Sequence, residues 1–150
     1  MSRSQFRSIL TNQAGKSLPS PLGTVGNRNP PAKAGNYADM SASLMLPVVI
    51  NNYNDGYEVA SPVGKFDANS LGIYDLGGNV SEWCHNIYDV NLSGQANVQR
   101  DPMGAVEGEY HVILGASWRH GSITELRFSY RDYSDKHRND VGFRIARYTE

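Results

Sequence analysis

The chain of 150 residues has a single cysteine, no surplus of charge and no long apolar run. Because Cys84 has no second cysteine to pair with, internal disulfides are excluded, which suits a reducing compartment such as the cytoplasm. The 14 Lys and Arg residues nearly balance the 15 Asp and Glu residues, so the sequence predicts neither nucleic acid nor an anionic membrane as a partner. No run of 18 apolar residues is present, so it predicts no membrane-spanning helix.

Long periodic hydrophobic segments are also absent, which argues against a helical bundle, a coiled coil and a doubly wound sheet. Hydrophobic residues make up 39% of the chain, and they are mixed with 15 Gly, 7 Pro and many Asn, Asp and Ser residues. The 9 Tyr, 4 Phe and 2 Trp argue against disorder, because disordered chains contain few aromatic residues. The composition therefore predicts a compact, loop-rich domain with short strands.

The N-terminal part of the chain differs from the rest. Residues 1–38 contain five basic residues and no acidic one, and residues 12–36 show no hydrophobic periodicity. The first ten residues lack the apolar core of a signal peptide. We predict an extended or poorly ordered segment over residues 1–33 and a folded domain over residues 34–150.

Hydrophobic alternation predicts strands over residues 109–115, 126–130 and 141–148. The segment VSEWC (80–84) is predicted to start a short helix, and the apolar run 44–50 to form an edge strand or a packed loop because it contains a proline. These elements together predict a small antiparallel sheet formed mainly by the last 45 residues.

Four sequence blocks resemble, in the same order, those of the formylglycine-generating enzyme (sulfatase-modifying factor) superfamily. They are DGYEVASPVGKFDANSLGIYDLGGNVSEWC (55–84), GASW (115–118), an Arg-rich stretch (127–131) and VGFRIAR (141–147). The resemblance covers the C-terminal part of the family domain. It implies an α+β, C-type-lectin-like fold with short antiparallel strands and much irregular structure.

The resemblance also implies two calcium sites. The first consists of the side chains of Asp75 and Glu82 and the carbonyls of Gly78 and Val80. The second consists of Asn36, the carbonyl of Tyr37, Asp55 and the carbonyl of Tyr57. Calcium takes six to eight oxygen ligands and accepts this mixture of carboxylates and carbonyls. In the alternative interpretation, Asp75 and Glu82 bind turn amides and cap the predicted helix without an ion.

The copper-dependent members of the family use two cysteines that follow the block matching GASW. The first of these positions is occupied here by His120, and the second falls among Ile123, Thr124 and Glu125. Because Cu(I) requires soft thiolate ligands, the sequence predicts no copper site and no generation of formylglycine. Cys84 lies in a different block and cannot replace both cysteines.

Other branches of the superfamily use non-haem iron. The four histidines of this chain (His85, His111, His120 and His137) lack the close spacing typical of a metal site. A site assembled by the fold from His120 and Glu125 remains the enzymatic alternative.

Residues 118–140 combine Trp, Tyr and Arg with Ser, Asp and Asn, a mixture typical of binding surfaces. Some lectin-like relatives carry ligand-binding residues in this region. We expect exposed ligand contacts at Trp118, Arg119, His120, Tyr133 and Lys136. The resemblance implies structural, paired roles for Arg127, Arg131 and Arg144.

Three hypotheses follow. The first is a calcium-stabilised binding or accessory module, without formylglycine chemistry, for an unidentified ligand or protein partner. The second is an oxidase that depends on non-haem iron or another metal. The third is a degenerate family fragment that folds as a homo-oligomer.

Overall fold

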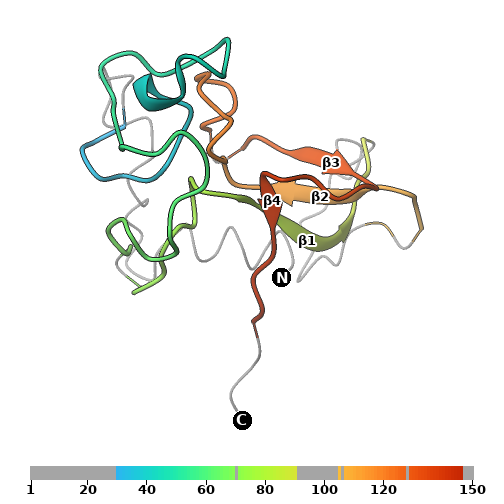
Figure 1. Ribbon diagram of the computed structural model, residues 1–150. Helices are drawn as coiled ribbons and strands as arrows, with labels where there is room; N and C mark the ends of the chain where they lie inside the picture. The colour runs from blue at the N-terminus through green and yellow to red at the C-terminus, as the bar shows by residue number, and fades with distance from the viewer. Residues whose placement is uncertain (1–29, 70, 91–104, 106, 128, 147–150) are drawn as a thin grey trace.

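The computed structural model describes residues 30–69, 71–90, 105, 107–127 and 129–146. Figure 1 shows long loops on one side of the molecule and the short strands on the other. Most of the predicted N-terminal segment, residues 1–29, lies outside the described residues. In the described part, no helix is long and apolar enough to cross a membrane.

The four strands form one sheet in the order β3-β2-β1-β4. They are β1 (Ser81–Ile87), β2 (His111–Leu114), β3 (Asp132–Ser134) and β4 (Val141–Gly142). The pairs β1–β2 and β2–β3 are antiparallel, but β4 runs parallel to β1. The expected purely antiparallel sheet is therefore wrong at the β4 edge, because residues 135–140 carry the chain from β3 at one edge to the opposite edge (Figure 1).

The helix predicted from VSEWC is wrong, because these residues belong to β1. Cys84 and Asn86 are buried and His85 between them is exposed, which is the period-two burial of a strand. The Ser81 hydroxyl donates to the Gly115 carbonyl at 2.9 Å, so a polar residue occupies a buried position of this strand. Because some buried positions of β1 carry polar residues, its sequence lacks the hydrophobic alternation from which a strand is predicted.

The strand predicted over 109–115 is confirmed as β2, although its burial differs from the expectation. Val112, Ile113 and Leu114 are all buried, so both faces of β2 are covered. Residues 147 and 148 of the strand predicted over 141–148 lie outside the described residues. The described part forms a strand only at β4, and Phe143 and Ile145 beyond it are exposed.

The strand predicted over 126–130 is wrong. The Leu126 N–H donates to the Ser122 carbonyl at 3.1 Å, which makes a helical turn. The Ser122 hydroxyl and the Glu125 carboxylate close the start of this turn in the manner of a capping box. The strand begins only at Asp132.

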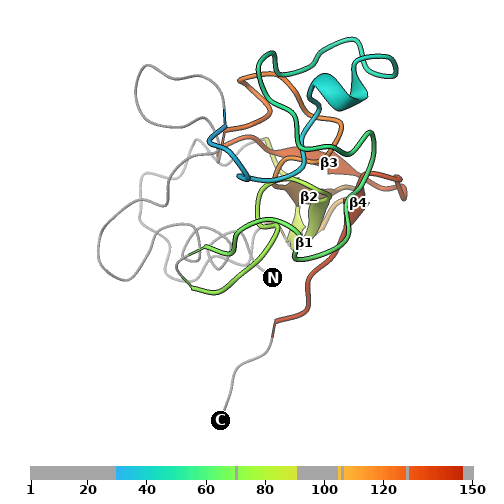
Figure 2. The ribbon, with the colours of Figure 1, turned by 60° about the vertical axis from the view of Figure 1, so that its left-hand side comes forward.

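The apolar run 44–50 forms a loop and not an edge strand, but the expected packing holds only for Ile50 because most of the run is exposed. It follows the short 3-10 helix η1 (Met40–Ala42), which the Asp39 side chain caps by accepting the Ser41 N–H at 2.7 Å. Ile50 is buried, whereas Leu44 is fully exposed. Figures 1 and 2 both place η1 away from the strands, among the loops.

Two groups of buried side chains form the core. One lies on the sheet and contains Leu76, Cys84, Val112 and Leu114, with Ile73 and Tyr88 at its edge. The other joins the N-terminal loops to the segments that follow β2, and contains Tyr37, Ile50, Tyr53, Ala116 and Leu126, with Ala34 at its edge. The second group fixes the position of residues 115–126, where the candidate site lies.

Candidate functional site

The GASW segment directly follows β2 and is held from both sides. Gly115 has a φ of 81°, which favours glycine and turns the chain at the end of the strand. The Gly78 N–H donates to the Ala116 carbonyl at 3.0 Å, and the Trp118 N–H donates to the Asn79 carbonyl at 2.9 Å. These bonds fasten the segment to the glycine-rich turn before β1.

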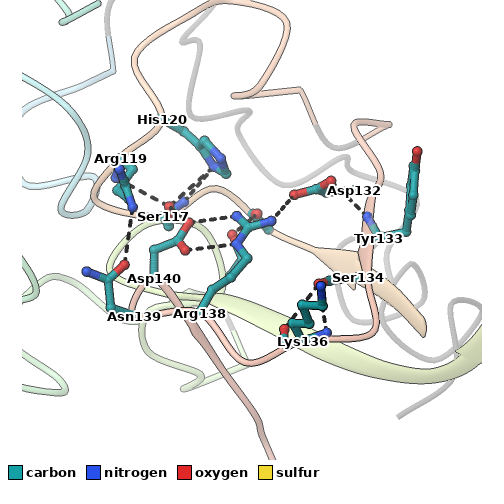
Figure 3. A network of polar contacts seen from close by, with 12 residues as sticks. Ser117, Arg119, His120, Asp132, Tyr133, Ser134, Lys136, Arg138, Asn139 and Asp140 are labelled. Atoms are coloured by element: carbon teal, nitrogen blue, oxygen red, sulfur yellow. Dashed lines mark hydrogen bonds and ion pairs between the residues drawn. The ribbon is translucent and has the colours of Figure 1, made fainter. Parts of the chain in front are cut away.

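Ser117 is fully buried and lies at the centre of a polar network (Figure 3). Its N–H donates to His120 Nδ1 at 3.0 Å, and its hydroxyl donates to Asp140 Oδ2 at 3.1 Å. The same hydroxyl oxygen accepts the Arg119 N–H at 3.3 Å. One serine thus joins the loop after β2 to the segment before β4.

Arg138 neutralises the buried end of this network. Its guanidinium binds Asp140 through two bonds, from Nε to Oδ1 at 3.0 Å and from Nη2 to Oδ2 at 2.8 Å, and it also pairs with Asp132 of β3. Burial alone would raise the pKa of Asp140, but the hydrogen bonds and charge of Arg138 outweigh burial and hold that pKa below its usual range. Sequence analysis did not select Arg138, Asp140 or Ser117.

His120 is buried, and one hydrogen bond selects the tautomer of its neutral ring. Because Nδ1 accepts the Ser117 N–H, the neutral ring carries its proton on Nε2. Burial lowers the pKa of His120, and the carboxylates of Glu125, Asp140 and Asp132 only partly oppose that shift.

The Ser117, His120 and Asp140 side chains do not form a catalytic triad. A nucleophilic serine needs a histidine nitrogen free to accept its proton. Here the Nδ1 lone pair is occupied by the Ser117 N–H, and the Ser117 hydroxyl proton goes to Asp140. The arrangement ties two chain segments together.

The five predicted ligand contacts are not equally accessible. Trp118 and His120 are 5% and 7% exposed, so the expectation that they form exposed contacts is wrong in this structure. The Trp118 N–H is bonded to Asn79 in the turn before β1, whereas the His120 carbonyl accepts the Ala38 N–H from the N-terminal loops. Arg119, Tyr133 and Lys136 are exposed, and the Arg119 guanidinium lies 5.4 Å from the Trp118 ring centroid.

Tyr133 belongs to an aromatic cluster that the sequence did not reveal. Its ring centroid lies 4.2 Å from that of Tyr88 and 5.3 Å from that of Tyr110. The Arg131 guanidinium lies 4.5 Å from the Tyr88 ring centroid and donates to the Asp89 carbonyl at 2.7 Å. Tyr110 and Tyr133 are exposed, so this tyrosine cluster forms an aromatic surface at the β3 edge of the sheet.

In the first predicted calcium site, the Asp75 carboxylate has one oxygen without a hydrogen-bond partner among the described residues, and the Glu82 carboxylate is paired with Arg144. Asp75 Oδ2 accepts the Gly64 N–H at 2.7 Å, whereas Asp75 Oδ1 is buried without a hydrogen-bond partner among the described residues. Glu82 Oε1 accepts from Arg144 Nη2 at 2.6 Å and from Nε at 2.9 Å. The Asp75 oxygen fits a bound cation, but the charge of Glu82 is met by Arg144. With no helix here, capping of a helix by these carboxylates is excluded.

In the second predicted calcium site, the carboxylate organises a turn. Asp55 accepts the Tyr37 N–H at 2.9 Å and the Tyr57 N–H at 2.8 Å. The amide of Asn36 donates to the Val59 carbonyl at 2.7 Å, but its Oδ1 is buried without a hydrogen-bond partner in the described part of the chain. An unsatisfied buried oxygen fits a cation here as well.

Asp39 is a further acidic group beside this second site, which sequence analysis missed. Asp39 Oδ2 accepts the Asp55 N–H, and within the described ranges neither carboxylate forms an ion pair. Burial, together with the charge of Asp39, raises the pKa of Asp55 to about 6, although hydrogen bonds from main-chain amides oppose that shift. The pair therefore lacks the positive charge that Arg144 supplies at the first site.

The residues of the redox alternatives form no cluster of three metal ligands in the described part of the chain. Cys84 is buried in the sheet core, and Glu125 binds the Ser122 N–H and hydroxyl. Among the described residues, no group of three His, Cys, Asp or Glu side chains is arranged to hold a metal ion. That finding does not cover calcium sites built from amide and carbonyl oxygens.

Solved structures share this fold. PvdO from Pseudomonas aeruginosa superposes with a TM-score of 0.67 at 27% identity, covering 95% of this chain and 49% of that chain. Treponema denticola variable protein 1 superposes with a TM-score of 0.51 at 24% identity, covering 84% of this chain and 45% of that chain. The second likeness concerns the fold alone.

Curated relatives match shorter stretches. The formylglycine-generating enzyme of Mus musculus is 31% identical over 102 residues, which is 65% of this chain and 27% of that protein. The serine/threonine-protein kinase Pkn1 of Chlamydia trachomatis is 34% identical over 83 residues, which is 55% of this chain and 12% of that protein. The chain thus spans between 12% and 27% of the length of these two relatives. A family model described as the sulfatase-modifying factor enzyme 1-like domain matches residues 23–149, and the chain belongs to that family.

Proposed function

We propose that the chain is a calcium-stabilised binding or accessory module of this family that does not generate formylglycine. The observation that carries the proposal is a pair of buried oxygens, Asn36 Oδ1 and Asp75 Oδ1, that have no hydrogen-bond partner among the described residues. A buried acceptor left unsatisfied is costly, and a bound cation would remove that cost. A C-type-lectin-like version of the fold is part of the same proposal.

The first predicted site would hold its ion with oxygens from the turn before β1 and from β1 itself, and the second with oxygens from two loops. Asp75 and Glu82, with the Gly78 and Val80 carbonyls, would hold one. Asn36 and Asp55, with the Tyr37 and Tyr57 carbonyls, would hold the other. Bound calcium supplies positive charge and no redox chemistry. The bound ions would then hold together chain segments that belong to no regular secondary structure or lie at the start of a strand.

The absence of formylglycine chemistry is supported by the residue at the first copper-cysteine position. His120 stands there, buried, with Nδ1 occupied by the Ser117 N–H. A thiolate pair is needed for Cu(I), and the one cysteine, Cys84, is buried in β1.

Binding is supported by the tyrosine cluster beside Arg131, in which Tyr110 and Tyr133 are exposed and Tyr88 is partly buried. Tyrosine offers a rigid, amphipathic contact that loses little entropy when it binds a partner. Arg119 and Lys136 are exposed and add positive charge to residues 118–140.

Calcium is tested by thermal unfolding in EGTA and in calcium chloride. We expect calcium at about 100 times its Kd to raise the Tm by about 5–10 °C. Asp55→Asn should reduce that rise, whereas Asp135→Asn, at an exposed aspartate, should retain it. An unchanged Tm in EGTA, with no calcium in the purified protein, would contradict the proposal. Stoichiometric iron or copper would instead favour the oxidase.

Self-association is a second candidate, favoured by exposed apolar side chains. Leu44, Val63 and Ile145 are 99%, 88% and 84% exposed. Exposed apolar surface is commonly covered by another copy of the same chain. Light scattering that shows only monomer at high concentration would contradict this candidate.

A further inference from the structure

The loop that contains His120 connects the two sides of the molecule. The His120 carbonyl accepts the Ala38 N–H at 3.1 Å. The next residue, Gly121, lies so close to the N-terminal loops that an added Cβ would be 2.6 Å from the Val48 carbonyl oxygen and 3.0 Å from that of Ala38. Residues 117–121 therefore hold the sheet side of the molecule against residues 38–48.

The hydrogen bond that shapes this loop requires a neutral imidazole. The Ser117 N–H donates to His120 Nδ1 at 3.0 Å, so Nδ1 must present its lone pair. A protonated imidazole carries hydrogen on both nitrogens and would point one donor at another. The Ser117 hydroxyl oxygen lies 3.4 Å from Nδ1, but it is already bonded to Asp140 and to the Arg119 N–H. Protonation therefore breaks the bond between the Ser117 N–H and Nδ1.

The charged groups around His120 act on a protonated ring in opposite directions. Glu125 on the following turn, Asp132 of β3 and Asp140 before β4 would attract it, whereas Arg138 would repel it. The Tyr130 ring centroid lies 5.8 Å from that of His120. Arg138 is already paired with both Asp132 and Asp140 (Figure 3). Glu125 forms no ion pair among the described residues, which makes it the natural partner for an imidazolium.

We propose that His120 is a pH-sensitive latch, which in its neutral form closes residues 117–121 against residues 38–48 and on protonation releases them. Release would uncover Trp118, which is 5% exposed in the closed loop, beside Arg119, which is already exposed. Acidification would then create a binding surface that neutral pH conceals. This inference does not depend on calcium.

The latch is tested by NMR titration of the full chain in calcium-containing buffer between pH 7.5 and 5.5. We expect the Ser117 amide to be protected at pH 7.5 and to exchange about tenfold faster, after correction for intrinsic rates, once His120 is protonated. The midpoint of this change should coincide with the His120 imidazole titration. In a Trp83→Phe background, acrylamide quenching of Trp118 should increase over the same range.

Two variants separate the latch from general acid effects. In His120→Asn, the Asn Oδ1 can accept the Ser117 N–H at any pH, so the transition should vanish. In His85→Asn, at an exposed histidine of β1, it should remain. A wild-type Ser117 amide that stays protected while His120 titrates would overturn the proposal, as would an unchanged transition in His120→Asn. If His120→Asn does not fold, the wild-type titration decides by itself, because coincident midpoints support the latch and separate midpoints overturn it.

Discussion

Arg138 and Arg144 each neutralise a carboxylate that the fold buries, in Asp140 and Glu82 respectively. The pairing of Arg144 was expected of a structural arginine. Arg131, for which such a role was also expected, binds a main-chain carbonyl. Arg127, for which the same role was expected, is exposed. Arg138 was not predicted, because an Arg-x-Asp spacing looks the same on a surface, and only the folded structure shows that Asp140 is buried and bonded to Ser117.

Replacing Arg138 by leucine should leave the buried Asp140 carboxylate without its cation. We expect the free energy of unfolding to fall by about 2 kcal/mol, below the range for fully buried pairs because the Arg138 side chain is 31% exposed. Urea unfolding measures the change. Arg119→Leu, at an exposed arginine, serves as the control, and an equal loss in both variants would show that the Asp140 pair is not specially stabilising.

At the scale of elements, the sequence predicted those segments whose burial follows hydrophobicity. β2 was found because its buried residues are Val, Ile and Leu. β1 was missed because polar Ser81 and Asn86 are among its buried residues. The turn at 122–125 carried a readable Ser-x-x-Glu signal, but the alternation over residues 126–130 pointed to a strand instead.

The glycine-rich turn before β1 depends on the absence of a side chain at Gly78. Its φ is 103°, and an added Cβ would lie 3.0 Å from the Asn36 main-chain N and O atoms. Gly78→Ala should therefore lower the free energy of unfolding by about 3 kcal/mol, from both conformational strain and displaced backbone.

Gly72→Ala is the matched control for this prediction. Gly72 has a φ of 74°, but no atom lies within 4 Å of its added Cβ, so only the conformational cost of about 1 kcal/mol applies. Chemical denaturation compares the two variants. Equal losses would mean that the close approach to Asn36 does not contribute.

At the scale of the whole molecule, stability should depend on pH through His120. Burial lowers the pKa of this side chain from its ordinary 6.5, so between the folded and unfolded values the unfolded chain binds more protons. Stability from His120 is therefore complete above pH 6.5 and is lost as the pH falls below it.

Asp55 acts in the opposite direction, because its pKa is raised to about 6 and the folded state takes up that proton first as the pH falls. Comparing wild type with His120→Asn cancels the Asp55 contribution. The stability advantage of wild type should grow from pH 5.5 to 7.5, as measured by urea unfolding at each pH. An advantage that does not change with pH would contradict the assignment.

The general architecture and the family were readable from the four sequence blocks. The candidate site was readable only in part, because Trp118 and His120 are buried where their loop is bonded to Asn79 and Ala38, which are far away in the sequence. Likewise, the proximity of Asp39 and Asp55 follows from how two loops fold back on each other.

Because Cys84 is buried, the reactivity of its thiol reports whether the sheet core is open or closed. It is the one thiol in the chain, and it lies in the sheet core with Val112 and Leu114. A water-soluble alkylating reagent can reach it only when that core opens. The rate at which Cys84 is modified therefore measures the opening of the sheet core. Mass spectrometry can follow this modification without an added label.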